Sequence, residues 1–270
     1  MRMESRSPPI TIDNGLCIRF AQLKHEIPEN RIGRGKLYDL IHLEPQKRLA
    51  IHEHLRRHAE VCDRLKLKPR IAQNFEVRPL GKQSGWWVVD HWIEGRPLNE
   101  MSEPNSAVWP LSRIAWLGGE ILRALGELHS VDVIVRELTP DRIYVEPSRI
   151  TLTDFELARL VNGGISVQGA WKSENPYRAP EVSDRNPRLQ SDLYSWARVM
   201  CFVLTGHLIP KTIPSLLPYP KIEQLLKRFL HSSFGRRPKT TDEVLVEWMS
   251  MMSRIEFLIL VILPHSKSSL

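Results

Sequence analysis

A long amphipathic helix followed at once by three short β-branched segments is the feature that most limits how this chain can fold. Apolar side chains recur at spacings of three and four over residues 111–128, which is the period of a helix with one buried stripe. The segments Val133–Val135, Ile143–Val145 and Ile150–Thr153 follow, and β-branched residues favour strands. The pattern predicts a helical body that carries a small β-rich loop region.

Two further helices are predicted beyond this region, at Ser191–Thr205 and Lys221–His231. Before residue 95 the character is different, because short β-like runs surround a charged helical stretch from about Lys47 to Leu67. These runs are Leu16–Phe20, Leu37–Leu43 and Trp86–Ile93. Turn residues at Glu94–Pro97 separate the two parts and predict a boundary there.

Composition excludes several classes of protein. The chain has 270 residues with a formal net charge of +7, and so modest an excess is typical of a solvated face, so we expect no nucleic-acid partner. Three widely spaced cysteines indicate no disulfide framework and favour the cytoplasm. The longest apolar run, Phe257–Leu263, is shorter than the roughly 20 residues that span a bilayer. We therefore expect no secretory signal and no transmembrane segment.

Five short segments after residue 126 occur in a fixed order. They read ELHSVDVIVRELTPDRIYV, ITLTDFELAR, NPYRAPEV, SDLYSWARVMCFVLTG and GRRPKTTDEVL. In order and spacing they resemble the large lobe of protein kinases, strongly from about Trp116 to Trp248 and more weakly from Leu37 to Leu98. Each string alone would be a weak signal, whereas five in order are specific.

The resemblance implies an α+β, bilobal protein-kinase-like fold of the eukaryotic-like serine/threonine type. We expect a divergent, β-rich N-lobe with one main helix at residues 1–95 and a larger, mainly α-helical C-lobe at residues 96–249. Residues 250–270 do not resemble the end of a kinase domain. They are expected to form an atypical apolar tail.

The resemblance also assigns structural roles. Glu181 of the APE string and Arg237 match a pair that the family buries in its large lobe, where one charge without the other would be costly. Asp192 matches the residue that braces the catalytic-loop backbone, and Arg136 keeps the arginine of the H-R-D motif. Phe155 matches a member of a hydrophobic column between the lobes, which can form here without nucleotide.

Two carboxylates match catalytic positions of the family. Asp154 begins the segment that stands where kinases have D-F-G, whose aspartate holds Mg²⁺ against the phosphates of ATP. Glu137 replaces the aspartate of H-R-D and would be the base that accepts the substrate hydroxyl proton, with a side chain one methylene longer. Thr139 stands where serine/threonine kinases carry a lysine beside the transferred phosphate.

Other positions of the ATP and magnesium site are altered. Arg142 replaces the asparagine that binds a second Mg²⁺, and two unit charges about 4 Å apart repel by roughly 4 kcal/mol at an effective dielectric near 20. We therefore expect Arg142 to pair with Asp154 or Glu137. Glu156 replaces the flexible glycine of D-F-G and adds a negative charge beside the phosphates.

In the small lobe, the string YDLIHLEP resembles the strand that carries the ATP-orienting lysine, and it places Ile41 at that position. Side chains alternate along a strand, so Lys36 is expected to face away from the side of Ile41. On the next helix His58 stands where the family has a glutamate. Gly33 and Gly35 are interpreted as a tight turn before the strand. The lysine–glutamate pair is thus predicted to be missing.

These departures favour a pseudokinase that acts by binding a protein partner, as a scaffold in signalling. An active serine/threonine kinase is the first alternative, with Glu137 as base, Asp154 on Mg²⁺ and ATP as phosphate donor. The second is a small-molecule phosphotransferase of related fold, against which the APE string and Arg237 count. The leading hypothesis requires no cofactor, whereas ATP and Mg²⁺ belong to the alternatives.

Overall fold

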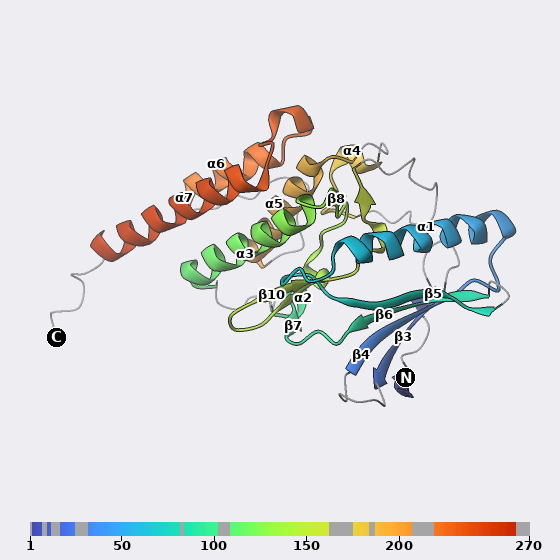
Figure 1. Ribbon diagram of the computed structural model, residues 1–270. Coiled ribbons are helices and arrows are strands. Elements are labelled where there is room, and N and C mark those ends of the chain that lie inside the picture. Colours follow the sequence, from blue (N-terminus) through green and yellow to red (C-terminus); the bar gives the residue numbers. More distant parts are fainter. Residues whose placement is uncertain are drawn as a thin grey trace.

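The computed structural model has a smaller lobe built on a sheet and a larger lobe built mainly of helices (Figure 1). This is the α+β, bilobal arrangement that the sequence predicts. The structure describes residues 2–6, 10–11, 17–24, 32–81, 84–101, 109–161, 175–183, 187–206 and 219–262. Within these ranges no helix is both long enough and apolar enough to cross a membrane.

The smaller lobe contains an antiparallel sheet whose strands run in the order β1-β3-β4-β6-β5, with β2 beside β3. The central strands β3 and β4 pair along their whole length, from Cys17 opposite Asp39 to Lys24 opposite Ile32. The strands are β1 Arg2–Arg6, β2 Ile10–Thr11, β3 Cys17–Lys24, β4 Ile32–Asp39, β5 Asn74–Pro79 and β6 Gly85–His91.

Helix α1 (Pro45–Arg64) lies across one face of this sheet (Figure 1). It begins with proline in its first turn, where a missing backbone N–H leaves no helical hydrogen bond unmade. Ile51 and Leu55 are buried and pack in one cluster with Tyr38 and Val88 of the sheet. Apolar contacts of this kind fix the position of the helix on the small lobe.

The larger lobe is organised around helix α3 (Leu111–His129), which has the bounds that the apolar stripe predicts. Two small antiparallel sheets, β10-β9-β7 and β11-β8, belong to this lobe, and all of their strands except β7 follow α3. The remaining helices are α2 Leu98–Met101, α4 Pro180–Ser183, α5 Leu189–Thr205, α6 Pro220–Phe229 and α7 Thr241–Ile262, with short 3-10 turns η2 Pro140–Arg142, η3 Phe155–Leu157 and η4 Phe234–Arg236. The strands are β7 Arg96–Pro97, β8 Val133–Ile134, β9 Ile143–Val145, β10 Ile150–Leu152 and β11 Arg159–Leu160.

Two tryptophans hold α5 and α7 against α3. The rings of Trp196 and Trp248 meet edge to face, with centroids 5.3 Å apart. Trp196 Nε1 donates to the Gly118 carbonyl at 3.1 Å, and Trp248 Nε1 donates to the Ala115 carbonyl at 2.9 Å. Gly118 has no room for a larger side chain, because a Cβ there would lie 2.7 Å from the Trp248 ring.

Helix α7 passes through residue 250, where the sequence places the start of an apolar tail. Met252 is 1% exposed and belongs to the core of the large lobe. The helix therefore packs on the lobe beyond the proposed boundary. The division of the chain at residues 95 and 249 stays a prediction.

The backbone joins the two lobes at two places, and only one of them is where the chain crosses from one lobe to the other. At the crossing, Gly95 has φ +89°, and a Cβ there would lie 2.5 Å from the Val145 carbonyl oxygen. A second join lies at Leu152 of β10, whose N–H donates to the Arg70 carbonyl at 2.8 Å. Its own carbonyl accepts from the Ala72 N–H, also at 2.8 Å. Residues 70–72 lie between α1 and β5, so the small lobe is fixed to the large one at both points.

Candidate functional site

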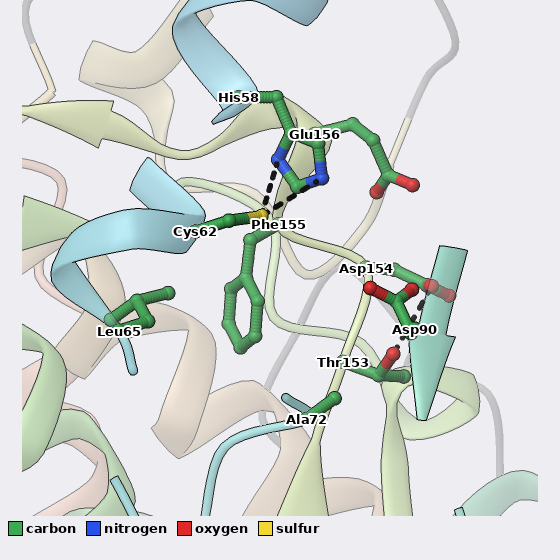
Figure 2. Close-up of a pocket in the computed structure, with 9 residues that line it drawn as sticks. All are labelled: His58, Cys62, Leu65, Ala72, Asp90, Thr153, Asp154, Phe155 and Glu156. Carbon is green, nitrogen blue, oxygen red and sulfur yellow. Dashed lines mark hydrogen bonds between the residues drawn. The ribbon is translucent and has the colours of Figure 1, made fainter. Parts of the chain in front are cut away.

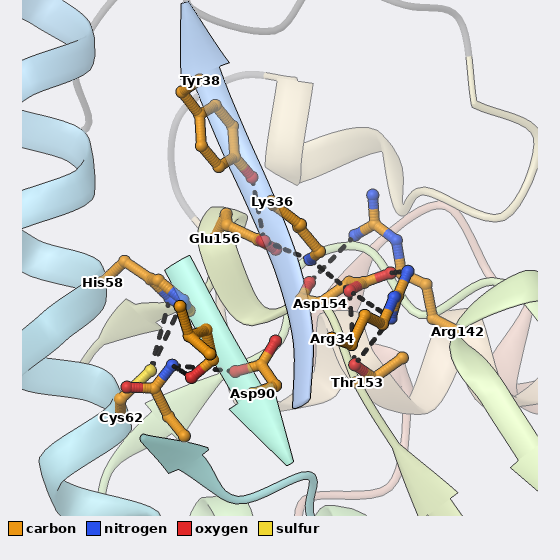
Figure 3. Close-up of polar contacts among 12 residues, drawn as sticks. Arg34, Lys36, Tyr38, His58, Cys62, Asp90, Arg142, Thr153, Asp154 and Glu156 are labelled. Atoms are coloured by element: carbon orange, nitrogen blue, oxygen red, sulfur yellow. Dashed lines mark hydrogen bonds and ion pairs between the residues drawn. The ribbon is translucent and has the colours of Figure 1, made fainter. Parts of the chain in front are cut away.

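Basic side chains of both lobes converge on Asp154, which follows β10 at the junction of the lobes (Figure 3). Arg34 of β4 lies with Nη1 3.1 Å from Oδ1 and Nη2 3.4 Å from Oδ2 of Asp154. Lys36 Nζ also contacts Oδ1, and Arg142 Nη1 donates to the Asp154 carbonyl at 3.4 Å. Burial alone would raise the pKa of this carboxyl, but Lys36 and Arg34 hold it below its ordinary value.

Lys36 is 3% exposed and contacts a second carboxylate, that of Glu156. The Tyr38 hydroxyl donates to Glu156 Oε1 at 2.9 Å. Lys36 and Tyr38 stand two residues apart on β4, so their side chains leave the same face of the sheet. Burial would raise the pKa of Glu156, but Lys36 lowers it. A buried lysine is thus compensated by two carboxylates of the segment after β10.

The prediction that Ile41 faces the site is wrong. Strand β4 ends at Asp39, two residues before Ile41, which is 57% exposed in the turn that leads to α1. The Leu40 N–H donates to the Ser84 carbonyl at 2.9 Å and fixes the start of this turn. Lys36, and not Ile41, is therefore the side chain that contacts Asp154.

The prediction of a tight turn at Gly33 and Gly35 is also wrong, because both glycines lie inside β4. They pair there with Leu23 and Ala21 of the neighbouring strand. The alternating series at residues 34, 36 and 38 was the available signal for this strand. Pro45 was a second signal, since proline at a helix start leaves the preceding residues to a turn.

His58 of α1 is buried and faces a small cavity behind Asp154 (Figure 2). Its Nε2 lies 3.4 Å from the Cys62 sulfur one turn later. The cavity holds about 10 Å³, which is room for about one water molecule. Its walls come from both lobes and comprise His58, Cys62, Leu65, Ala72, Asp90, Thr153, Asp154, Phe155 and Glu156.

Burial raises the pKa of two groups in this cavity, the Asp90 carboxyl and the Cys62 thiol. Asp90 Oδ1 accepts from Asn74 Nδ2 at 2.8 Å. In the ranges that the structure describes, no three His, Cys, Asp or Glu side chains are placed so that they could share a metal ion. The cavity is therefore a small space that side chains of both lobes line.

Glu137 is 4% exposed, and both of its carboxylate oxygens are engaged. Oε2 accepts from Arg142 Nη2 at 2.8 Å, while Oε1 accepts from Asn175 Nδ2 at 2.9 Å and contacts Arg178. The pairing of Arg142 with Glu137 is one of the two that the sequence leaves open. Burial would raise the pKa of Glu137, but Arg142, Asn175 and Arg178 lower it. A carboxylate held in this way is a weak proton acceptor.

Asp192 lies under the loop that carries Glu137. It is fully buried and accepts from the backbone N–H groups of Val135 at 2.8 Å and Arg136 at 2.9 Å. Its Oδ2 also lies 2.9 Å from His129 Nε2. Arg136 has φ +68°, a conformation that costs free energy in a non-glycine residue. Asp192 compensates that cost through its hydrogen bonds to the loop.

Glu181 and Arg237 form a buried, two-pronged ion pair, with distances of 2.6 Å from Nη1 to Oε1 and 3.0 Å from Nη2 to Oε2. Ser191 adds a hydrogen bond to Oε1 at 2.7 Å. Phe155 is 4% exposed and lies in the same core cluster as Val135. The residues with expected structural roles are therefore in the interior of the large lobe or at its junction with the small one.

The site unites Asp154, Arg142 and Glu137, and it excludes Ile41. Sequence reasoning did not identify Arg34 and Lys36 as partners of Asp154, nor Asn175 and Arg178 as partners of Glu137. The donor set does not fit the magnesium ions of a kinase site. Mg²⁺ needs carboxylate oxygens that are open to it, whereas Asp154 is faced by Arg34 and Lys36.

Comparison with known proteins agrees with this architecture. Residues 35–255 match the family model described as "Protein kinase domain", so the chain belongs to the protein kinase family. Among curated relatives, the serine/threonine-protein kinase PknG of Mycobacterium leprae is 27% identical over 202 residues. The alignment covers 69% of this chain and 26% of that protein.

A second relative is the serine/threonine-protein kinase pkn2 of Myxococcus xanthus. It is 22% identical over 243 residues, which cover 79% of this chain and 29% of that protein. The chain thus spans less than a third of the length of these two relatives. The crystal structure of the Mycobacterium tuberculosis PknI kinase domain superimposes with a TM-score of 0.66 at 18% identity and covers 91% of this chain and 94% of that one. At this identity the likeness shows the fold alone.

Proposed function

We propose that this protein is a pseudokinase, which keeps the kinase fold and acts by binding a protein partner in signalling. The observation that carries the proposal is that the two carboxylates needed for phosphoryl transfer, Glu137 and Asp154, are both held by basic side chains of the same chain. A base must have a free lone pair for the substrate hydroxyl. A metal ligand must be open to the metal.

The carboxylates of the site are also compensated without a ligand. Lys36 and Arg34 compensate Asp154 and Glu156, while Arg142 and Arg178 surround Glu137. In an active kinase the negative charge of the metal-binding carboxylate is compensated by Mg²⁺. Internal compensation makes a nucleotide and its metal unnecessary for a stable closed fold.

The proposal is tested by a thermal-shift titration with ATP, alone and with Mg²⁺ or Mn²⁺. A ligand that binds only the folded state stabilises it by about 2.7 kcal/mol at a hundredfold excess over Kd. We expect no change of Tm with any combination. We also expect no transfer of labelled phosphate from ATP to the protein itself or to a generic protein substrate.

An active serine/threonine kinase is the second candidate, and the buried Lys36 beside Asp154 favours it. In that case Asp154 would have to exchange Arg34 and Lys36 for Mg²⁺. A metal-dependent rise of Tm, together with phosphate transfer that Asp154→Ala abolishes, would decide for this candidate. No described residue favours a small-molecule phosphotransferase over these two.

A cytoplasmic location belongs to the same proposal. Cys62 and Cys201 are buried free thiols, and free thiols are typical of a reducing compartment. Fractionation of cells that produce the full chain, followed by immunodetection, tests this expectation. Recovery outside the cytoplasmic fraction would contradict it.

A further inference from the structure

Arg34 contacts both lobes through one side chain, which is 19% exposed. Its guanidinium carbon lies 5.4 Å from the ring centroid of Phe20 on β3 and 6.0 Å from that of Tyr144 on β9. These distances are within the range of attraction between a cation and an aromatic face. The guanidinium thus has one aromatic neighbour in the small lobe and one in the large lobe.

The same group is fixed by oxygen atoms of the segment after β10 (Figure 3). Both terminal nitrogens face the Asp154 carboxylate, and Nη1 also lies 3.4 Å from Thr153 Oγ1. A planar guanidinium can do both things at once, since it pairs with a carboxylate in its plane and contacts aromatic rings with its faces. A lysine could supply the charge but not the planar contact.

A nucleotide bound between these lobes would need the same two features. Its base requires a slot between apolar or aromatic groups, and its metal supplies positive charge to the carboxylate after β10. Arg34 combines a flat, aromatic-stacking group with a positive charge on Asp154. It also lies on β4, the strand that presents Lys36 to the same carboxylate.

We propose that Arg34 is a built-in substitute for nucleotide, which fills the slot between Phe20 and Tyr144 and holds the two lobes closed through Asp154. The inference rests on the proposed function, because a bound nucleotide would displace the Arg34 side chain. It goes further in naming the residue that keeps nucleotide out. It also assigns Phe20 and Tyr144 as the walls of the closed slot.

We expect the protein to fold without the Arg34 side chain. In Arg34→Ala the Asp154 carboxylate keeps its contact with Lys36, so no buried charge is left without a partner. The vacated slot would open toward solvent between the two aromatic rings. The matched control is Arg78→Ala on β5 of the same sheet, where the arginine is 54% exposed and pairs with Glu76.

The first measurement is binding of adenosine, which carries no phosphate and needs no metal, by isothermal titration calorimetry. We expect Arg34→Ala to bind adenosine at least tenfold more tightly than the unchanged protein and Arg78→Ala. If the slot has the shape of a purine, Arg34→Ala should bind the control ligand cytidine only weakly. Arg34→Lys should bind adenosine little better than Arg34→Ala binds cytidine. Equal adenosine affinity in the unchanged protein and in Arg34→Ala would overturn the proposal.

The second measurement is amide hydrogen exchange, which reports on closure of the lobes without any ligand. Arg34→Ala should exchange at least tenfold faster than Arg78→Ala in β3 and β9, the strands of Phe20 and Tyr144. Unchanged exchange in both strands would contradict the interlobe role. If Arg34→Ala does not fold, the charge-balanced pair Arg34→Ala with Asp154→Asn takes its place in both measurements.

These outcomes separate the inference from the proposed function. Phosphate transfer by the unchanged protein would refute the pseudokinase proposal alone, provided that Arg34→Ala still gains adenosine affinity. If Arg34→Ala gains no adenosine affinity and the unchanged protein transfers no phosphate, the inference alone would be refuted. Arg34→Ala that gains affinity but no transfer supports both.

Discussion

Glu156 forms an ion pair with Lys36, so this buried lysine meets a carboxylate from the residue after Phe155 and none from helix α1 among the described residues. On α1, His58 and Cys62 line the small cavity that Glu156 also lines. No ion pair between Lys36 and α1 is found among the described residues. Helix α1 is therefore positioned by apolar packing of Ile51 and Leu55 on the sheet. The charge of Lys36 is compensated independently of where that helix lies.

Replacing Glu156 by glutamine should lower the free energy of unfolding by about 1–3 kcal/mol, since it weakens a buried hydrogen bond to a charged group. Lys36 keeps Asp154, which limits the loss. Urea unfolding measures the change. The control is Glu76→Gln on β5, whose exposed pair with Arg78 should contribute less than about 1 kcal/mol. Equal costs for the two variants would contradict the role given to Glu156.

The same glycine-to-alanine change should have opposite effects at two positions of α3. At Gly118 the new methyl group would meet the Trp248 ring, and overpacking of this kind costs about 1–3 kcal/mol. At Gly126 the nearest atom, Thr241 Oγ1, is 3.4 Å away, so the higher helix propensity of alanine should stabilise by up to about 1 kcal/mol. Thermal unfolding of both variants measures the signs, and a stabilised Gly118→Ala would show that α7 packs differently.

His54 on α1 should make stability depend on pH between about 4 and 6.5. Burial, and then His58, lower the pKa of His54 to about 4, below the ordinary value near 6.5. The unfolded chain thus binds a proton at a pH where the folded protein does not. The contribution of neutral His54 to the free energy of unfolding is complete above pH 6.5. It is lost as the pH falls toward 4, by up to about 2 kcal/mol at pH 5.

Urea unfolding at pH 7, 6 and 5 measures this slope. His54→Gln should have a flatter profile than the unchanged protein, since glutamine does not titrate. His42→Gln is the control for replacing a histidine at an exposed position, in the turn before α1. An unaltered slope in His54→Gln would assign the pH dependence to other groups.

In the buried pair Glu181–Arg237, replacing the arginine should cost more free energy of unfolding than replacing the glutamate. Arg237→Ala leaves the buried Glu181 carboxylate with the Ser191 hydroxyl and a backbone hydrogen bond but without its cation, and breaking such a pair costs about 3–5 kcal/mol. In Glu181→Gln the guanidinium keeps three backbone carbonyl acceptors, those of Gln190, His231 and Ser232. The Glu181→Gln variant should therefore lose less free energy of unfolding than Arg237→Ala.

A double-mutant cycle on these two positions measures the asymmetry and the coupling together. We expect a coupling energy of about 1–3 kcal/mol between Glu181 and Arg237. Additive losses in the double variant would mean that the pair contributes nothing beyond its separate contacts. Urea unfolding with unchanged m-values would show that the native and unfolded states remain comparable.

The large lobe could be predicted closely because its signals are local. The bounds of α3 follow from one apolar stripe, and β9 has the predicted bounds Ile143–Val145. The contacts of Asp192 and of the Glu181–Arg237 pair lie at motif positions with fixed spacing. In these cases the residues that meet are specified by strings of the sequence itself.

The small lobe, and the residues that hold the Glu137 carboxylate, could not be predicted in the same way. Alternation along β4 fixed which residues share a face, but not the residue at which the strand ends, so Ile41 was placed two residues beyond it. Asn175 and Arg178 reach Glu137 from 38 and 41 residues along the chain. No local pattern predicts contacts at that separation, because they depend on how the whole lobe is packed.

The backbone join at Leu152 restricts how the lobes can move. Two separate points of attachment, near Gly95 and at residues 70–72, define a line. Sliding of one lobe past the other would stretch hydrogen bonds at Leu152, whereas rotation about that line would not. Opening of the molecule is therefore expected to be a rotation about this line, and it must break the contacts that Arg34 and Lys36 make with Asp154.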